Sequence, residues 1–154
     1  MGYYTDATIC LNGHIASSAK SNYRKFCKEC GSKTISTCQK CNTHIQGTYE
    51  TPDVFAFGYD RPSYCHECGH PYPWTSQIID NALELISLDD DLPSDHKEII
   101  KNTFPDLVVE TPTTPVAAAK YKKYISKSAE YIQEGMKNLL IDVVTENVKK
   151  SLWG

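Results

Sequence analysis

Hydrophobic and polar positions follow different patterns in the two halves of the chain. Residues 32–37 and 44–49 are rich in β-branched side chains and alternate in polarity, as half-buried strands do. From Ile78 to Ile86 the apolar residues instead recur at helical spacing, and helix-forming composition continues beyond them. The pattern predicts an α+β protein, with short β-hairpins in the first half and α-helices in the second.

Prolines and polar stretches divide the second half. We expect Thr75 to cap a first helix, and Ser94 to begin a second helix that ends at Pro105. Residues 89–91 are three adjacent aspartates without the spaced pattern and glycine of a calcium loop, so they are interpreted as a solvated linker. Residues 107–109 are predicted to be a short extended segment.

The last stretch, residues 116–152, keeps a helical apolar pattern over its whole length. One uninterrupted helix would be a rod of about 55 Å. We therefore expect a break near Gly135 or residues 126–128, which gives three to four helices in all. The apolar stripe is either ordinary core or a surface for a second copy or a partner, because little else is predicted to cover it.

Eight potential metal ligands occupy the first 68 residues and fall into four pairs. The pairs are Cys10 with His14, Cys27 with Cys30, Cys38 with Cys41, and Cys65 with Cys68. Two ligands on one tight turn can reach the same ion, and a structural zinc takes four thiolate or imidazole ligands. The eight residues therefore predict two Zn²⁺ ions, with all seven cysteines used as ligands.

Three pairing schemes remain open. Sequential pairing joins the first pair with the second and the third with the fourth, giving two zinc ribbons. A cross-braced scheme joins alternate pairs, and a nested scheme joins the two middle pairs. The strand-like segments after Cys30 and Cys41 favour the sequential scheme. The odd number of cysteines disfavours disulfides, and iron is a minor alternative to zinc at this spacing.

Several residues beside the pairs have a predicted structural role. Gly31 and Gly69 directly follow a cysteine pair, and Gly13 precedes His14, so each is expected at the positive φ that turns backbone N–H groups toward sulfur. His66 and His70 lie in or near the fourth pair. Because the ligand set is already complete, we expect both to be surface residues or hydrogen-bond donors beside the ligands, and the same holds for His44, three residues after Cys41.

The composition changes at residues 71–74, which separate a Cys- and Gly-rich half from a half without cysteine. We assign residues 1–74 to a double zinc-ribbon domain and residues 75–154 to an α-helical domain. About 70 residues bury little apolar surface, so metal would replace the core as stabiliser. Seven thiols predict a reducing compartment, the cytoplasm, and the apolar runs are too short for a membrane span.

The formal charge is −3, divided as +1 up to Pro73 and −4 after it. Two zinc ions and seven thiolates would lower the total to −6 in the metal-bound protein. Nucleic-acid-binding proteins usually carry a strong basic footprint, so this balance disfavours nucleic acid as the partner.

One group of lysines stands out in the predicted last helices. It comprises Lys120, Lys122, Lys123 and Lys127, near Tyr121 and Tyr124. Such a group can bind phosphate, but Glu130 and Glu134 are expected to continue the same surface. The lysines are therefore interpreted as a solvated helix face.

Two resemblances follow from these motifs. Cys27-Lys-Glu-Cys30-Gly31 and Cys65-His-Glu-Cys68-Gly69 resemble the knuckles of the zinc-ribbon superfamily, which implies metal binding by residues 8–74. The order of the pairs, the junction at residues 72–75 and the ending at residues 148–154 resemble an uncharacterised bacterial family with two N-terminal ribbons and a helical C-terminal region. Neither resemblance implies an activity.

We expect a non-enzymatic zinc-binding adaptor that mediates protein–protein interaction. A catalytic zinc needs an open coordination position, and both predicted sites are full. Aromatic residues crowd the second predicted ribbon, and aromatics are favoured at binding hot spots. They are Phe55, Phe57, Tyr59, Tyr64, Tyr72 and Trp74. A protein partner is expected, and the C-terminal helices could form a homo-oligomer; no membrane contact is expected.

The alternative is a nucleic-acid-binding zinc-ribbon regulator. It would use a modest basic strip over the second and third pairs. The strip comprises Arg24, Lys25, Lys28, Lys33 and Lys40. Binding through phosphate contacts would weaken steeply with salt.

Overall fold

The computed structural model describes residues 2–19, 24–52, 58–141 and 143–154. The chain forms two compact units, Met1–Gln77 and Ile78–Gly154. The first contains the strands, and all of the second unit's elements are helical, so the α+β class is confirmed. Division at residues 74 and 75 into independently folding domains stays a prediction.

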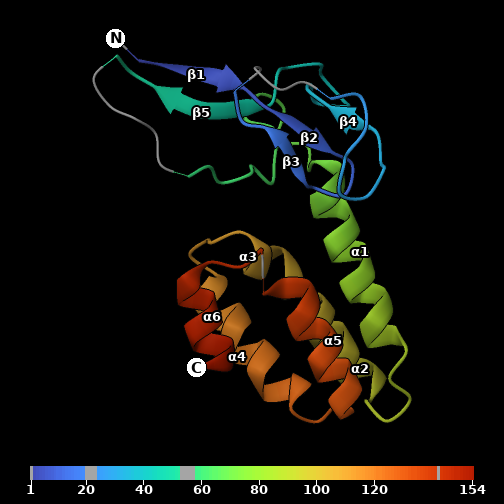
Figure 1. Cartoon of the computed structure of the whole chain (residues 1–154). Coiled ribbons are helices and arrows are strands. Elements are labelled where there is room, and N and C mark those ends of the chain that lie inside the picture. Colours follow the sequence, from blue (N-terminus) through green and yellow to red (C-terminus); the bar gives the residue numbers. More distant parts are fainter. Residues whose placement is uncertain (1, 20–23, 53–57, 142) are drawn as a thin grey trace. The chain divides into compact units, whose positions relative to one another are not determined.

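Two small antiparallel sheets form the first unit (Figure 1). β1 (Tyr3–Asp6) pairs with β5 (Gln46–Glu50). β2 (Thr8–Cys10) lies between β3 (Ile15–Ser17) and β4 (Thr34–Ile35). The strands are shorter than the two predicted segments, because the cysteine-bearing turns take up the residues between them. β2 places the first cysteine of the chain at the end of a central strand.

The core of the first unit is thin. Ile9 and Ile45 are fully buried, and the rings of Tyr72 and Trp74 stack with centroids 4.9 Å apart. Buried cysteines complete this cluster. A core of this size buries little apolar area, which agrees with the expectation that metal supplies part of the stability.

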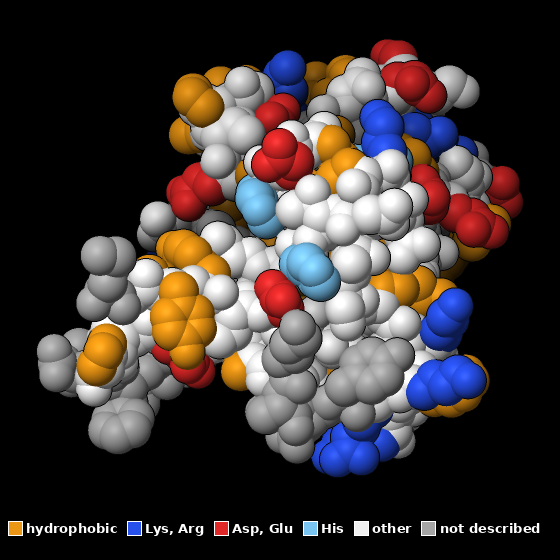
Figure 2. All heavy atoms as spheres, turned by 90° about the horizontal axis from the view of Figure 1, so that it is seen from above, with side chains coloured by type: hydrophobic (Ala, Val, Ile, Leu, Met, Phe, Trp, Pro, Cys, Tyr) orange, Lys and Arg blue, Asp and Glu red, His pale blue; other side chains and the backbone are white. Residues whose placement is uncertain are grey.

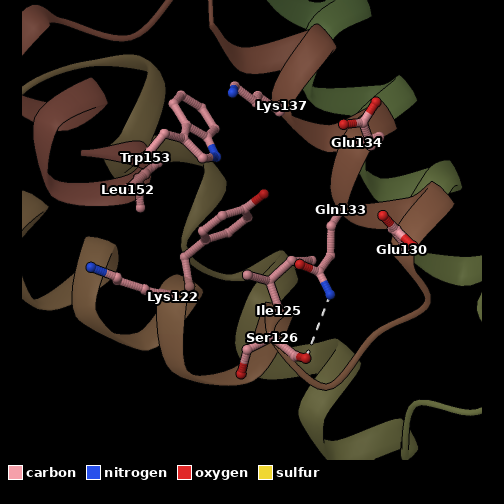
Figure 3. Close-up of a pocket in the computed structure, with 10 residues that line it drawn as sticks. Lys122, Ile125, Ser126, Glu130, Gln133, Glu134, Lys137, Leu152 and Trp153 are labelled. Carbon is pink, nitrogen blue, oxygen red and sulfur yellow. Dashed lines mark hydrogen bonds between the residues drawn. The ribbon is translucent and has the colours of Figure 1, made fainter.

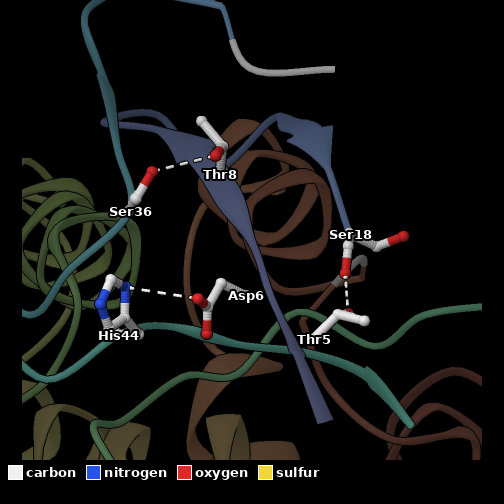
Figure 4. A network of polar contacts seen from close by, with 6 residues as sticks. All are labelled: Thr5, Asp6, Thr8, Ser18, Ser36 and His44. Atoms are coloured by element: carbon white, nitrogen blue, oxygen red, sulfur yellow. Dashed lines mark hydrogen bonds and ion pairs between the residues drawn. The ribbon is translucent and has the colours of Figure 1, made fainter. Parts of the chain in front are cut away.

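Hydroxyl groups tie the strands of the first unit to the loops beside them (Figure 4). Thr8 Oγ1 lies 2.9 Å from Ser36 Oγ, which joins β2 to the segment before the third ligand pair. Thr5 Oγ1 donates to the carbonyl oxygen of Ser18 at 2.6 Å, which joins β1 to the end of β3. These bonds fix loop positions that apolar packing alone would leave loose.

Six helices follow in the described residues (Figure 1). They are α1 (Pro73–Ser87), α2 (Ser94–Lys101), α3 (Phe104–Val108), α4 (Thr114–Ile125), α5 (Glu130–Leu140) and α6 (Glu146–Trp153). The expected three to four helices are too few. The predicted helix up to Pro105 and the predicted extended segment at residues 107–109 correspond to two helices, α2 and α3, and the last stretch breaks twice. None of these helices combines the length and apolar character that crossing a bilayer requires.

Local chemistry explains the differences from the predicted boundaries. Pro105 lies in the first turn of α3, where its missing N–H is harmless, and does not end a helix. The predicted break near residues 126–128 is confirmed, since α4 ends at Ile125 and α5 begins at Glu130, but Gly135 lies inside α5. A Cβ on Gly135 would lie 2.8 Å from Leu85 Cδ2, so this glycine permits close packing. Thr75 lies within α1, where its hydroxyl donates to the Ser63 carbonyl at 2.7 Å.

Asp89 is buried, and the linker prediction was wrong for this residue. Its side chain is 1% exposed. Its Oδ1 accepts from the N–H groups of Asp91 (2.9 Å) and Leu92 (3.1 Å), and its Oδ2 accepts from Ala129 N–H (2.9 Å). The carboxylate therefore closes the turn before α2 and fixes the start of α5 within the same unit.

The core of the helical unit absorbs most of the predicted apolar stripe. Ile132, Met136 and Leu140, all within residues 116–152, are fully buried in it. Tyr121 is 2% exposed. The stripe is therefore mainly ordinary core, which confirms the first of the two expectations for it.

Candidate metal centres

The three Cys-x-x-Cys loops share one local structure, which we call a knuckle. In each, the N–H of the first cysteine donates to the carbonyl five residues on, and the N–H four residues on donates back to the first cysteine, at 2.8–3.0 Å. An isolated β-bridge closes each loop, as Phe26 with Lys33 does around the first. The same backbone conformation thus occurs three times in the chain, and each time it brings two cysteine sulfurs together.

A residue with positive φ completes each ligand turn. Gly31 (75°) and Gly69 (74°) occupy this position as predicted, and Gly13 (92°) does so before His14. Asn42 takes it in the remaining knuckle with φ 63°. Asn42 was missed in the sequence, although asparagine is among the few residues that tolerate this conformation.

The first ligand group gathers Cys10, His14, Cys27 and Cys30, whose ligand atoms all lie within 4.8 Å of one another. Cys10 Sγ lies 3.5 Å from His14 Nδ1 and 3.7 Å from Cys30 Sγ. Cys27 Sγ lies 3.7 Å from the same ring nitrogen. The structure therefore joins the first and second pairs.

The second ligand group gathers Cys38, Cys41, Cys65 and Cys68 within the same limit. Cys38 Sγ lies 3.7 Å from Cys68 Sγ, and Cys41 Sγ lies 3.6 Å from Cys65 Sγ. The third and fourth pairs thus come together, and this grouping is the sequential one.

These distances fit a tetrahedral metal ion. With Zn–S near 2.3 Å and Zn–N near 2.0–2.1 Å, tetrahedral edges are about 3.8 Å for S–S and about 3.5 Å for S–N. The observed S–S separations are 3.6 and 3.7 Å, and the S–N separations are 3.5 and 3.7 Å. A disulfide would need about 2.05 Å. Both groups could hold one metal ion each.

Backbone N–H groups point at the cysteine sulfurs in all three knuckles. In each knuckle the N–H two residues after the first cysteine lies 3.3–3.4 Å from that cysteine's Sγ. Hydrogen bonds from the N–H groups of Cys68 and Glu67 lower the pKa of Cys65 to about 6. Donors aimed at a thiol favour its thiolate form, which is the form that binds metal.

Asn12 and Ser32 supply a further hydrogen-bond set in the first ligand group. Hydrogen bonds from the Ser32 side chain, the Ser32 backbone and the Asn12 side chain lower the pKa of Cys30 to about 5. The Asn12 amide lies 3.3 Å from Cys30 Sγ and donates to Ser32 Oγ at 3.0 Å. Neither residue was recognised from the sequence. Asn12 acts on Cys30 from a turn 18 residues away, and Ser32 acts on Cys30 from within the same knuckle.

Arg61 and Trp74 hold the turn that carries His14. Arg61 Nη1 donates to the Gly13 carbonyl at 2.6 Å, and its guanidinium lies 5.7 Å from the centre of the Trp74 ring. Trp74 Nε1 in turn donates to the Pro62 carbonyl at 2.9 Å. A Cβ on Gly13 would lie 2.8 Å from Trp74 Cβ. The segment before the fourth pair therefore braces the first ligand group.

Neither group includes His44, His66 or His70. His44 Nδ1 instead lies 3.6 Å from Asp6 Oδ2, an ion pair when the imidazole is protonated (Figure 4). The expectation that these histidines are not needed as ligands agrees with the grouping.

Comparison with known proteins places nearly the whole chain in one family. Residues 3–152 match the family model described as "Uncharacterized protein conserved in bacteria (DUF2321)". The chain belongs to this family. No curated protein and no solved structure matches it. The DUF2321 description gives no activity, so function must be argued from the site itself.

A pocket of about 320 Å³ lies in the helical unit of this DUF2321 chain (Figure 3). It lies among α4, α5 and α6, with Ile125 and Leu152 as buried apolar lining. Its charged lining residues are Lys122, Lys137, Glu130 and Glu134. Two lysines and two glutamates balance, so the pocket shows no preference for a ligand of either sign.

Proposed function

We propose that the protein is a non-enzymatic adaptor whose first unit is built around two structural Zn²⁺ ions, in the manner of a double zinc ribbon. The observation that carries the metal assignment is the pair of four-ligand groups with near-tetrahedral spacing. Zinc suits thiolate and imidazole ligands in this geometry better than calcium or magnesium, which prefer oxygen. The eight residues of these two groups are those that the sequence predicts as ligands.

Four protein ligands per ion support a structural role rather than catalysis. A catalytic zinc keeps an open position for water or substrate, and a complete set of four leaves none. Every cysteine of the chain belongs to one of the two groups, so a cysteine nucleophile would have to leave its metal. The seven thiols also support a reducing compartment such as the cytoplasm.

Exposed aromatic side chains support a binding role for the first unit. Tyr3 and Tyr4 are 61% and 56% exposed on β1, and Tyr49 is 49% exposed on β5. The rings of Tyr4 and Tyr49 lie 4.9 Å apart. Tyrosine is enriched at binding hot spots. Tyr4 and Tyr49 are also direct partners across β1 and β5, so the same pair helps to stabilise the two-stranded sheet. Of the six aromatic residues expected to contribute, Phe55 and Phe57 lie outside the described residues. The expectation was wrong for Tyr72 and Trp74, which are buried in the core of the first unit.

A second candidate function, binding of single-stranded nucleic acid, has one observation in its favour. Phe26 is 57% exposed, and exposed cations surround it in sequence and across the β-bridge: Arg24, Lys25, Lys28 and Lys33. Aromatic stacking beside basic residues is how such proteins hold bases. Against it, acidic side chains lie over much of the face seen in Figure 2, although Lys and Arg side chains gather at one edge of that face. The formal charge of −6 for the metal-bound chain also disfavours it.

Purification of the protein from its native host, with metal analysis of the eluted complex, tests the adaptor proposal. We expect a co-purifying protein that stays bound through a salt wash. Recovery of the chain alone under gentle conditions would contradict the adaptor role. A mobility shift with single-stranded RNA or DNA at low salt, lost in Phe26→Ala, would instead favour the second candidate.

A further inference from the structure

Helix α4 exposes one continuous row of side chains. We call this row, together with the residue just beyond the helix end, the α4 face. It comprises Val116, Ala119, Lys120, Lys123, Tyr124 and Lys127. The spacing of three and four residues places them on one side of the helix. Val116 is 53% exposed, although valine is usually buried.

The α4 face forms a shallow groove of about 410 Å³ whose lining combines two chemistries. Its apolar lining comes from Pro115, Val116 and Ala119, at the beginning of the helix. Its charged lining comes from Lys120 and Lys123. No carboxylate lines this groove among the described residues, in contrast to the pocket beside α5.

Tyr124 organises the charged part of the face. The ammonium groups of Lys123 and Lys127 lie 5.4 and 5.7 Å from the centre of its ring. The His96 ring meets the Tyr124 ring at 61°, with centroids 4.8 Å apart. Cation–π contacts of this length hold the two lysines near the ring and so concentrate positive charge there.

The carboxylates expected to balance these lysines lie elsewhere. Glu130 and Glu134 line the pocket of Figure 3 together with Lys122, which the sequence grouped with the other lysines. Within the described part of the chain, Lys120, Lys123 and Lys127 form no ion pair. The basic group is therefore divided between two surfaces, and the α4 face keeps three lysines that form no ion pair among the described residues.

Helix stability explains this arrangement only in part. Lysines near a helix C-terminus interact favourably with the helix dipole, and Lys123 lies in the last turn of α4. Lys120 lies before that turn, and the dipole gives no reason for the exposed Val116 and Ala119. An apolar half beside a basic half on one helix face is the surface that an amphipathic segment of opposite charge complements.

We propose that the α4 face binds an acidic amphipathic segment of a protein partner. Its apolar side chains lie on Val116 and Ala119, and its carboxylates face Lys120, Lys123 and Lys127. This inference rests on the proposed adaptor function and names the chemistry of the partner. A nucleic acid fits the face less well, because the apolar half offers its phosphates nothing and Tyr124 already contacts His96 and two lysines.

A synthetic helical peptide with leucines on one face and glutamates beside them tests the proposal on the zinc-loaded full chain. We expect measurable binding at low salt that weakens as salt rises. Exchanging the peptide's glutamates for glutamine, or its leucines for serine, should each weaken binding about tenfold or more. Exchange of all three lysines, Lys120→Glu, Lys123→Glu and Lys127→Glu, should abolish binding, and the milder Lys→Gln triple should weaken it.

The matched control moves the same charge change to other exposed positions. It combines Lys122→Glu, Lys137→Glu and Lys150→Glu. This control should bind the peptide within about threefold of the unchanged chain, allowing for screened long-range charge. Equal weakening by both triples would show general attraction and overturn the proposal. So would displacement of the peptide by a single-stranded oligonucleotide that depends on the same three lysines.

The native complex separates failure of this inference from failure of the adaptor role. If a partner co-purifies equally well with the unchanged chain and with the α4-face triple, the adaptor role stands and the α4 face is not its site. If neither recovers a partner and the peptide does not bind, both proposals fail.

Discussion

Exchange of one metal ligand, Cys65→Ser, should unfold the first unit and leave the helical unit intact. Serine is a poor zinc ligand, and the second group would then keep three of its four ligands. Zinc contributes about 10–16 kcal/mol to the folding of small zinc domains. Each fully buried apolar side chain contributes only about 1.5–3 kcal/mol, and the first unit has few of them, such as Ile9 and Ile45. A bound zinc ion would therefore outweigh any single part of this core.

The assay combines far-ultraviolet circular dichroism, limited proteolysis and zinc analysis of the same preparation. We expect helicity to be nearly unchanged, because the helices outside the first residues of α1 lie in the second unit. Proteolysis should remove residues before about position 78 and spare the fragment Ile78–Gly154. His66→Ala, in the same knuckle but outside the ligand group, should behave as the unchanged chain does.

Loss of the whole helical signal in Cys65→Ser would refute this reasoning. It would mean that the two units unfold as one cooperative structure. Retention of both zinc ions with an unchanged proteolysis pattern would refute the ligand assignment instead. The two failures are distinguishable in one experiment because the first concerns the helices and the second concerns the metal.

Further predictions concern single side chains. Asn12→Ala should weaken zinc binding at the first ligand group about tenfold, because the ligand loses its outer hydrogen bond, and should leave the second group unchanged in a chelator competition. Arg61→Gln should also weaken the first group selectively, through loss of its bond to the Gly13 carbonyl. Asp89→Asn should destabilise the helical unit by about 2 kcal/mol or more in urea unfolding, because one amide N–H₂ must face a backbone donor. Burial raises the pKa of Asp89, but hydrogen bonds led by that from the Ala129 N–H outweigh this effect and lower the pKa overall. The stability that the Asp89 carboxylate contributes is therefore present above the ordinary carboxyl pKa and is lost as pH falls through the lowered value.

The ligand groups could be predicted from the sequence because each ligand pair is local. Two cysteines on one turn, followed by a glycine, specify a knuckle whatever surrounds it, as Cys27 to Gly31 does. Which pairs come together depends on strands that lie far apart in the sequence. The strand-like segments favoured the sequential scheme, and the structure groups the pairs in that way. Asn12 was not recognised because its bond to Cys30 spans 18 residues.

The helical half was less predictable in detail. Its apolar spacing indicated helices, but the buried role of Asp89 depends on Ala129, 40 residues further on. From the sequence alone, a run of three aspartates is expected to be solvated, because the sequence does not reveal the partner of Asp89. The division of the lysines between two surfaces likewise depends on how α4 and α5 pack, which spacing along one helix does not reveal.

Metal content of the protein purified without added metal tests the central claim most directly. Elemental analysis should find two zinc ions per chain, one for each ligand group. Replacement by Co²⁺ should then give the visible absorption of tetrahedral thiolate sites, with one Cys₃His and one Cys₄ environment. A chain that folds with native proteolytic resistance while holding no metal, or only one ion, would contradict the account.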